Sequence, residues 1–162
     1  ITLQFDEGTN TSGMNPWGKP NKTRILPEGA TLIVVFKNKN TNGILLIYDD
    51  LNNTMFYGSI TFNLYHPYLQ NRGLFTMAGA DGQLGSGYNN TNTNEMSFFN
   101  GTQIAGPSIT NSDWDGSDGW PLVQLWDTHT HYVSLKGDVS TVEYQSNGDC
   151  LVPAVFVIES SN

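Results

Sequence analysis

Hydrophobic and polar residues alternate in short runs along most of the chain, and this pattern predicts β-strands. Gly, Asn and Pro interrupt every long window, so no apolar period of 3.6 residues persists long enough to predict a helix. The predicted strands are residues 2–5, 30–37, 43–48, 55–64, 73–77, 96–99, 102–104, 130–135, 139–145 and 152–159. Such short strands, separated by regular turn signals, predict an all-β fold: a single antiparallel β-sandwich, jelly-roll or immunoglobulin-like.

Turn residues predict which strands pair locally. Residues 40–43 (NTNG) join two apolar runs, 30–37 and 43–48, and predict a hairpin. Asn100-Gly101 predicts a second, tight hairpin. Gly58 lies inside an apolar run and predicts a bulge.

The chain of 162 residues predicts one domain. We divide it into an N-terminal segment, residues 1–23, and a β-sandwich domain, residues 24–162. Residues 80–94 and 106–121 carry no strand signal. Long loops of this kind usually carry function, so a specific site is expected there.

Composition narrows the location and the partners. Charged residues make up only 14% of the chain, against a usual level of roughly 25%. The net charge is −8 and the seven Lys and Arg are dispersed, which argues against nucleic acid as a partner. No apolar run approaches the ~20 residues that cross a bilayer, so membrane insertion is not expected. A surface rich in Asn, Thr, Ser and Gly, on a chain that starts at Ile1, indicates a secreted protein whose signal segment has been removed.

The acidic stretch 113–119 (DWDGSDG) is the sharpest candidate for a ligand site. Alternate carboxylates on a Gly-rich backbone can converge on Ca²⁺, which takes six to eight oxygen ligands. The alternative is a surface loop whose Asp side chains cap turns. No cofactor is required by this interpretation, and the candidate Ca²⁺ ligands are Asp113, Asp115, Ser117, Asp118 and Asp127.

A second grouping overlaps the first. Asp127, His129 and His131 alternate on a predicted strand and therefore share one face, an arrangement that can bind Zn²⁺ or Cu²⁺. Two histidines alone do not make a site, and exposed strand faces often carry such residues. The third histidine, His66, has no partner that the sequence reveals.

Catalytic signals are weak, and we predict that the protein is not an enzyme. The single cysteine, Cys150, precedes an apolar run and is expected to be buried and inert. Residues 85–87 (GSG) lack the strand and helix of a nucleophile elbow. Glycan binding is an alternative, because four tryptophans could stack on sugars: Trp17, Trp114, Trp120 and Trp126. A polysaccharide-acting enzyme is the third hypothesis.

Five Asn-x-Ser/Thr sequons mark candidate glycosylation sites, mostly at predicted turns. They are Asn10, Asn21, Asn52, Asn89 and Asn100. The alternative for Asn100 is a residue chosen for the positive φ of its turn.

The succession of residues 30–38 (ATLIVVFKN), 44–51 (ILLIYDDL), 98–104 (FFNGTQI), 125–134 (LWDTHTHYVS) and 148–160 (GDCLVPAVFVIES) resembles a group of exported β-domains of unknown function. These domains occur in archaeal and bacterial surface proteins. The resemblance covers roughly residues 24–160 and implies an all-β fold at the cell surface. His131 stands where the group carries an acid, and the group's longer N-terminal half is missing.

A short N-terminus predicts an incomplete sheet. An edge without a partner exposes backbone N–H and C=O groups, which a strand from another molecule can cover. The alternating apolar residues Ile1, Leu3 and Phe5 are the expected donor. We therefore predict a structural subunit of an extracellular filament, tube or surface layer, built from copies of itself by donor-strand exchange. A glycan-binding or adhesion module is the alternative.

Overall fold

A computed structural model describes six strands and the segments that join some of them. The described residues are 30–36, 42–49, 51, 58–80, 82, 95–107, 109, 112–116, 126–146 and 151–161. The strands are β1 (Gly43–Tyr48), β2 (Ser59–Ala80), β3 (Met96–Phe99), β4 (Thr102–Ala105), β5 (Trp126–Gln145) and β6 (Val152–Ser161). This part of the chain contains no helix, which confirms the all-β prediction, and therefore none that could span a membrane.

The six strands form one antiparallel sheet in the order β1-β6-β2-β5-β3-β4. Among the described residues, the two edge strands are β1, which pairs with β6 alone, and β4, which pairs with β3 alone. Because the sheet is not closed, its topology does not establish the jelly-roll or immunoglobulin-like sandwich expected from the sequence.

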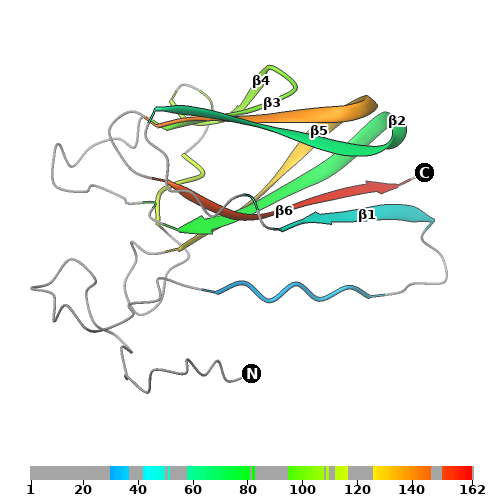
Figure 1. The fold of residues 1–162 in the computed structure, drawn as a ribbon, viewed down its shortest axis with the longest axis horizontal. Coiled ribbons are helices and arrows are strands. Elements are labelled where there is room, and N and C mark those ends of the chain that lie inside the picture. The colour runs from blue at the N-terminus through cyan, green and yellow to red at the C-terminus, as the bar shows by residue number, and fades with distance from the viewer. Residues whose placement is uncertain are drawn as a thin grey trace, which may run out of the picture.

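Two long strands bend together and fold the sheet over (Figure 1). Tyr65 pairs with Val139 and Leu69 with Gly137, so residues 66–68 oppose the single residue Asp138. Such a bulge bends the strands, and Gly137 adopts a φ of +86° at the bend. The sequence analysis wrongly divided β2 and β5 into four strands, because residues near the bend break the local pattern while pairing resumes beyond it.

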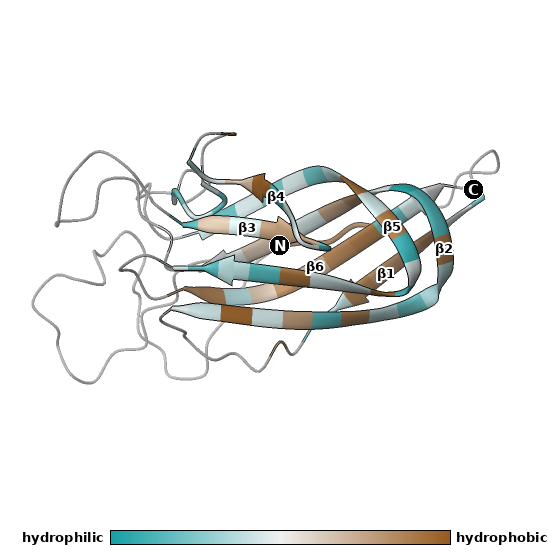
Figure 2. Ribbon diagram, turned by 90° about the horizontal axis from the view of Figure 1, so that it is seen from above, coloured by the Kyte–Doolittle hydropathy of each residue, from teal (hydrophilic) through white to brown (hydrophobic). Residues whose placement is uncertain are grey.

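The bend divides the sheet into two halves that face each other (Figure 1). The first half holds residues 59–65 of β2 and 139–145 of β5, with β3 and β4. The second half holds residues 69–80 of β2 and 126–137 of β5, with β6 and β1. Hydrophilic and hydrophobic residues alternate along the long strands (Figure 2), so that each strand presents an apolar face to the opposite half.

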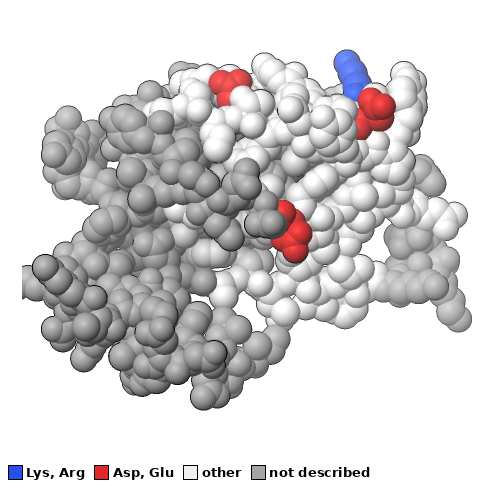
Figure 3. Space-filling view, viewed as in Figure 1, with Lys and Arg blue, Asp and Glu red and all other residues white. Residues whose placement is uncertain are grey.

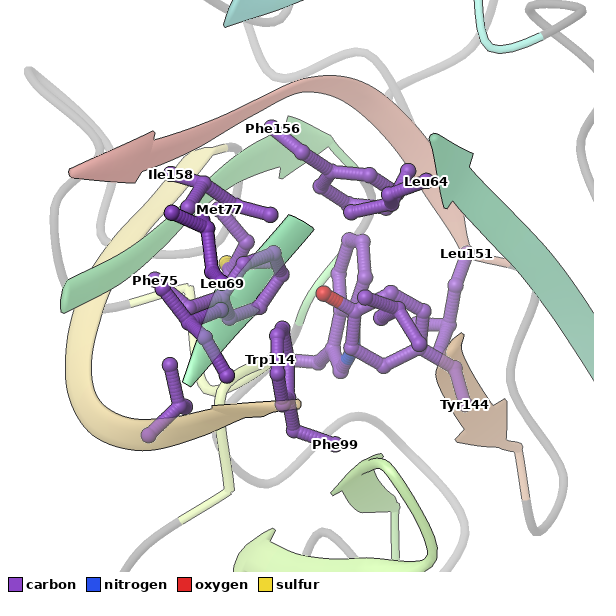
Figure 4. Close-up of a cluster of buried hydrophobic side chains, with 13 residues drawn as sticks. Leu64, Leu69, Phe75, Met77, Phe99, Trp114, Tyr144, Leu151, Phe156 and Ile158 are labelled. Atoms are coloured by element: carbon purple, nitrogen blue, oxygen red, sulfur yellow. The ribbon is translucent and has the colours of Figure 1, made fainter. Parts of the chain in front are cut away.

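The core lies between the halves (Figure 4). Phe62 of β2 packs edge-on against Phe156 of β6, with ring centroids 5.2 Å apart. Phe75 of β2 packs against Phe99 of β3 at the same distance, 5.2 Å. The fully buried aromatic residues in the described part of the chain are Phe75, Phe99, Trp114, Tyr144 and Phe156.

The strand predicted over 30–37 is not formed in the described residues. Residues 30–36 have no strand pairing, so the predicted hairpin with 43–48 is wrong. The segment is apolar enough for a strand, but its side chains find no buried face: Phe36 is 85% exposed. The predicted strand 2–5 and Cys150 lie outside the described residues.

The hairpin between β3 and β4 confirms its turn signal. Asn100 and Gly101 adopt φ angles of +48° and +74°, as the tight hairpin turn requires. Gly58 also has a positive φ, +99°, but it precedes β2 instead of forming a bulge inside the strand.

Candidate functional site

The loop at residues 112–116 is held against the core by one aromatic side chain. Trp114 is fully buried and packs edge-on against Tyr144 of β5, with ring centroids 5.2 Å apart. The hydroxyl of Ser112 accepts a hydrogen bond of 3.1 Å from the backbone N–H of Trp114. Since Trp114 points inward, its two neighbours, Asp113 and Asp115, are fixed beside the sheet, where both are also buried.

The first residues of β5 face this loop. Asp127, with no exposed surface, accepts a 2.6 Å hydrogen bond on Oδ1 from the backbone N–H of Gly116. His129 Nε2 lies 3.7 Å from Asp127 Oδ1 and 3.9 Å from Asp115 Oδ1. The donor atoms of Asp115, Asp127 and His129 all lie within 4.8 Å of one another, which is close enough for one metal ion to contact all three. We call these three residues the Asp–His cluster.

Two further predicted residues form a pair beside the cluster. His131 Nε2 lies 2.7 Å from Asp113 Oδ1, a short hydrogen bond within an ion pair. Asp113 is 1% exposed. His131 therefore engages Asp113 and does not lie among the three cluster residues.

Burial and the neighbouring charges shift the pKa values of Asp127 and His129 in opposite directions. Burial raises the pKa of Asp127, while His129 and the N–H of Gly116 oppose that change. The neighbouring Asp127 carboxylate raises the pKa of His129, and burial opposes it. The charged form of Asp127 and the charged form of His129 therefore stabilise each other, as expected for buried groups of opposite sign.

Unpaired polar atoms concentrate around the loop. Among the described residues, seven buried side-chain polar atoms have no hydrogen-bond partner. Five of the seven belong to Asp113, Trp114, Asp127, His129 and Tyr144. Buried polar groups in proteins are nearly always paired, so this concentration marks a region built around something more than its own side chains.

A glycine makes room for the Asp127 carboxylate. A Cβ atom on Gly82 would collide with Oδ2 of Asp127 and would lie 2.7 Å from the carbonyl carbon of Trp114. Any other residue at this position would force the carboxylate or the loop to move. Gly82 was not identified from sequence, because it lies in a Gly-rich stretch where no signal distinguishes one glycine from the next.

The structure brings together residues that the sequence analysis had placed in two separate sets. Asp115 and Asp127 came from the predicted Ca²⁺ loop, and His129 came from the predicted transition-metal face. Ser117 and Asp118, the other predicted Ca²⁺ ligands, lie outside the described residues, as do Trp17 and Trp120. The predicted loop 106–121 is described only at 106–107, 109 and 112–116, without strands.

The two described tryptophans, Trp114 and Trp126, differ in burial. Trp114, a candidate for stacking on sugars, is instead fully buried in the core. Trp126 is only partly buried, and its Nε1–H donates a 2.8 Å hydrogen bond to Thr31 Oγ1. That bond ties residue 31 to the start of β5.

His66, for which the sequence revealed no partner, is bonded on both ring nitrogens at the bend. Nδ1 lies 2.8 Å from the Pro67 carbonyl oxygen, and Nε2 lies 2.9 Å from Ser140 Oγ. Asn100 Nδ2 also donates to Ser140 Oγ, at 3.4 Å. We call His66, Ser140 and Asn100 the bend network; it stabilises the turn of β2 and β5.

Asn100 is the one predicted sequon whose asparagine is described. Besides Ser140, its Nδ2 donates to the Ser134 carbonyl at 3.1 Å, and its Oδ1 accepts from the Thr141 N–H at 2.8 Å. A glycan on Nδ2 would remove one of its two N–H donors, and so one of the bonds to Ser134 and Ser140, which means that the geometry favours the structural alternative for Asn100. The other sequons, Asn10, Asn21, Asn52 and Asn89, lie outside the described residues.

The edge of the second half is apolar. β1 reads GILLIY, and on its outward face Leu45 is 38% and Ile47 is 46% exposed. Residues 31–36 (TLIVVF) add four exposed apolar side chains: Leu32, Val34, Val35 and Phe36. The described surface in this view carries few charged side chains (Figure 3). The predicted donor residues Ile1, Leu3 and Phe5 lie outside the described residues.

Comparisons of the chain with protein-family models, with curated proteins and with solved structures give no match.

Proposed function

We propose that the protein is a structural subunit of an extracellular assembly, and that copies join by strand addition at β1. In this proposal the two facing halves of the sheet form a β-sandwich of the kind exported domains use. The observation that supports it best is that the same chain has an apolar edge strand and an apolar segment without strand pairing among the described residues.

The two edges of the sheet differ in how they are protected. β4 has four residues, and the side chain of its Gln103 donates to the carbonyl oxygens of Ala105 and Pro107, both at 3.2 Å. Short, polar edges of this kind resist pairing with other chains. β1 has six residues with no charge and no proline, and among the described residues no strand pairs with its outer side, which suits it to strand addition.

The occupant we infer for the β1 edge is the 31–36 segment of a second copy. This segment has strong strand propensity and exposes Phe36 by 85% and Leu32 by 65%, yet it pairs with no strand of its own chain among the described residues. The bond from Trp126 to Thr31 ties its first residues to β5 and not to β1. A segment from one copy that pairs with the next makes a contact that does not close, and such contacts propagate into filaments.

Crosslinking between two different variants tests this directly. One protein carries Val34→Cys and the other carries Leu45→Cys, both with Cys150→Ser to remove the native thiol. A bifunctional maleimide, which tolerates several registers, is added to the mixture. We expect crosslinked dimers that contain one copy of each variant, and ladders at higher concentration.

The matched control replaces the β1 variant with Gln103→Cys on β4, which should give no crosslink to Val34→Cys. The proposal is wrong if a single chain that carries both Val34→Cys and Leu45→Cys crosslinks within itself at low concentration while the mixture stays monomeric. That outcome would assign the 31–36 segment to its own edge.

Glycan binding is a second candidate, favoured by one feature that lies between the β3–β4 hairpin and residues 132–136 of β5. Tyr132 is 86% exposed beside a groove of about 350 Å³ that Asn100, Thr102 and Lys136 also line. An exposed aromatic ring beside amide and hydroxyl groups suits a sugar face. Glycan-array screening of the wild type and of Tyr132→Ala tests it: signals that Tyr132→Ala abolishes support it, and an array without signals removes it.

A further inference from the structure

We propose that the Asp–His cluster, Asp115, Asp127 and His129, binds a divalent transition-metal ion of the zinc type. This inference does not depend on assembly at β1. It rests on a set of ligand atoms that lie close together and on two buried atoms, Asp127 Oδ2 and His129 Nε2, that make no hydrogen bond.

The donor geometry fits a small ion. Two ligands of a tetrahedral zinc ion, each at about 2.0–2.2 Å, lie roughly 3.3–3.5 Å apart. His129 Nε2 lies 3.7 Å from Asp127 Oδ1 and 3.9 Å from Asp115 Oδ1. Small side-chain rotations would shorten each of these two distances by a few tenths of an ångström and bring His129 Nε2 and the two carboxylate oxygens to the spacing of zinc ligands.

Unpaired buried atoms point to a ligand independently of this geometry. Asp127 is fully buried and its Oδ2 has no hydrogen-bond partner. His129 Nε2 is also inaccessible and unpaired, and it faces two carboxylates at distances too long for hydrogen bonds. A cation bound by His129 Nε2 and the Asp127 carboxylate would offset the cost of burying these polar groups.

The charge balance points the same way. Asp113, Asp115 and Asp127 are 1%, 7% and 0% exposed, and the two histidines are the charged partners that the structure gives Asp113 and Asp127. No described Lys or Arg forms an ion pair with Asp113 or Asp127. Even with both imidazoles protonated, three carboxylates leave a buried negative charge, which a divalent cation neutralises.

The participation of an imidazole selects the metal class. Ca²⁺ takes oxygen ligands, whereas zinc and its neighbours combine His nitrogen with carboxylate oxygen. The site therefore differs from the all-oxygen Ca²⁺ loop expected from the sequence. Asp113 contacts His131 at 2.7 Å, and its Oδ2, which makes no hydrogen bond, is a further oxygen that the loop could offer to the ion. His131 is thus a positioning residue that orients Asp113.

A titration of the wild-type protein tests the proposal without any variant. Zn²⁺ is added to the full chain while the imidazole nitrogens are followed by long-range ¹H–¹⁵N NMR. We expect Nε2 of His129 to shift strongly, His131 to shift weakly and His66 to stay unchanged. Thermal unfolding should move to higher temperature with Zn²⁺ and stay unchanged with Ca²⁺, because binding to the native state alone stabilises it.

Variants separate the ligands from their surroundings. His129→Ala should abolish the thermal shift by Zn²⁺. His131→Gln should weaken Zn²⁺ affinity by roughly 10–100-fold, as outer partners of metal ligands do. His66→Gln, the matched histidine at the bend, should leave the affinity unchanged. The proposal is overturned if Zn²⁺ leaves His129 Nε2 unshifted, or if Ca²⁺ stabilises the wild type and His129→Ala alike.

Discussion

The two halves of the folded sheet differ in how many of their backbone and side-chain polar groups form hydrogen bonds. The first half ends in the short polar strand β4, and the bend network beside it, His66, Ser140 and Asn100, is mutually hydrogen-bonded. The second half ends in the apolar strand β1 and contains Asp127 and His129 with unpaired buried atoms. A half that satisfies its own groups acts as a scaffold, whereas one that leaves backbone and side-chain groups open is where partners are expected.

The largest contrast should appear when the same charge is placed on each edge. Ile47→Lys puts a positive charge on the outward face of β1, where it should prevent another strand from pairing. We expect loss of assembly in light scattering and electron microscopy. Gln103→Lys on β4 is the matched control and should assemble like the wild type. Equal loss in both variants would show that the edges are not different.

A methyl group at Gly82 should have the next largest effect. Gly82→Ala places a Cβ against Asp127 Oδ2 and within 2.7 Å of the Trp114 backbone, so the loop must move away from β5. Overpacking of this kind costs about 1–3 kcal/mol. Chemical denaturation measures it, and Gly101→Ala, where no atom lies within 4 Å of the new Cβ, gives the separate cost of a side chain at a positive φ of 74°. A fully stable Gly82→Ala protein would contradict the close approach described here.

Removing one histidine from the bend and one from the second half should distinguish a structural polar residue from a ligand-binding one. His66→Ala leaves buried Ser140 without its ring partner, and we expect a loss of roughly 1–3 kcal/mol. His129→Ala, in metal-free buffer, should cost less, since Nε2 makes no hydrogen bond. With Zn²⁺ present the order should reverse, because only His129 then contributes a ligand. Urea unfolding of both variants, with and without Zn²⁺, gives the four free energies of unfolding to compare.

Tyr144 and Ser97 are exceptions in the first half, and the effect of changing Tyr144 should be the smallest. Its hydroxyl is buried without a partner, and burial, with a smaller effect from the Asp113 charge, raises its pKa well above the ordinary value. The folded protein therefore holds this proton more tightly than the unfolded chain. Its contribution is complete below about pH 10 and is lost as the pH rises above that value.

Tyr144→Phe removes the hydroxyl and should change stability near pH 7 by less than about 1 kcal/mol. It should also reduce the loss of stability above pH 10, which thermal melts from pH 8 to 11 would show. An unchanged alkaline loss in Tyr144→Phe would assign that loss to other groups.

Local patterns predicted the elements whose partners are close in sequence. The strand 43–48 matches β1, and the Asn100-Gly101 turn correctly predicted the β3–β4 hairpin. The bend was missed because Pro67 and Gly137 interrupt the local pattern, whereas pairing between two long strands carries the ladder past them. Residues 30–37 were predicted as a strand on propensity alone, but a strand needs a partner edge, which no local signal supplies.

The candidate site was foreseen in parts. Spacing placed Asp127 and His129 on one strand face, and the acidic loop drew attention to Asp115. That these two groups meet depends on the burial of Trp114, which positions the loop, and on the space left by Gly82. Neither residue stands out in a sequence, because each acts only through contacts made after folding.

The most direct test of the account is hydrogen exchange of the β1 amides at low and high protein concentration. In the monomer, the amides of β1 that do not bond to β6 should exchange freely. We predict that their protection rises with concentration, together with protection of residues 31–36, while β4 stays unchanged. Protection of β1 that is independent of concentration, or a rise confined to β4, would contradict assembly through the β1 edge.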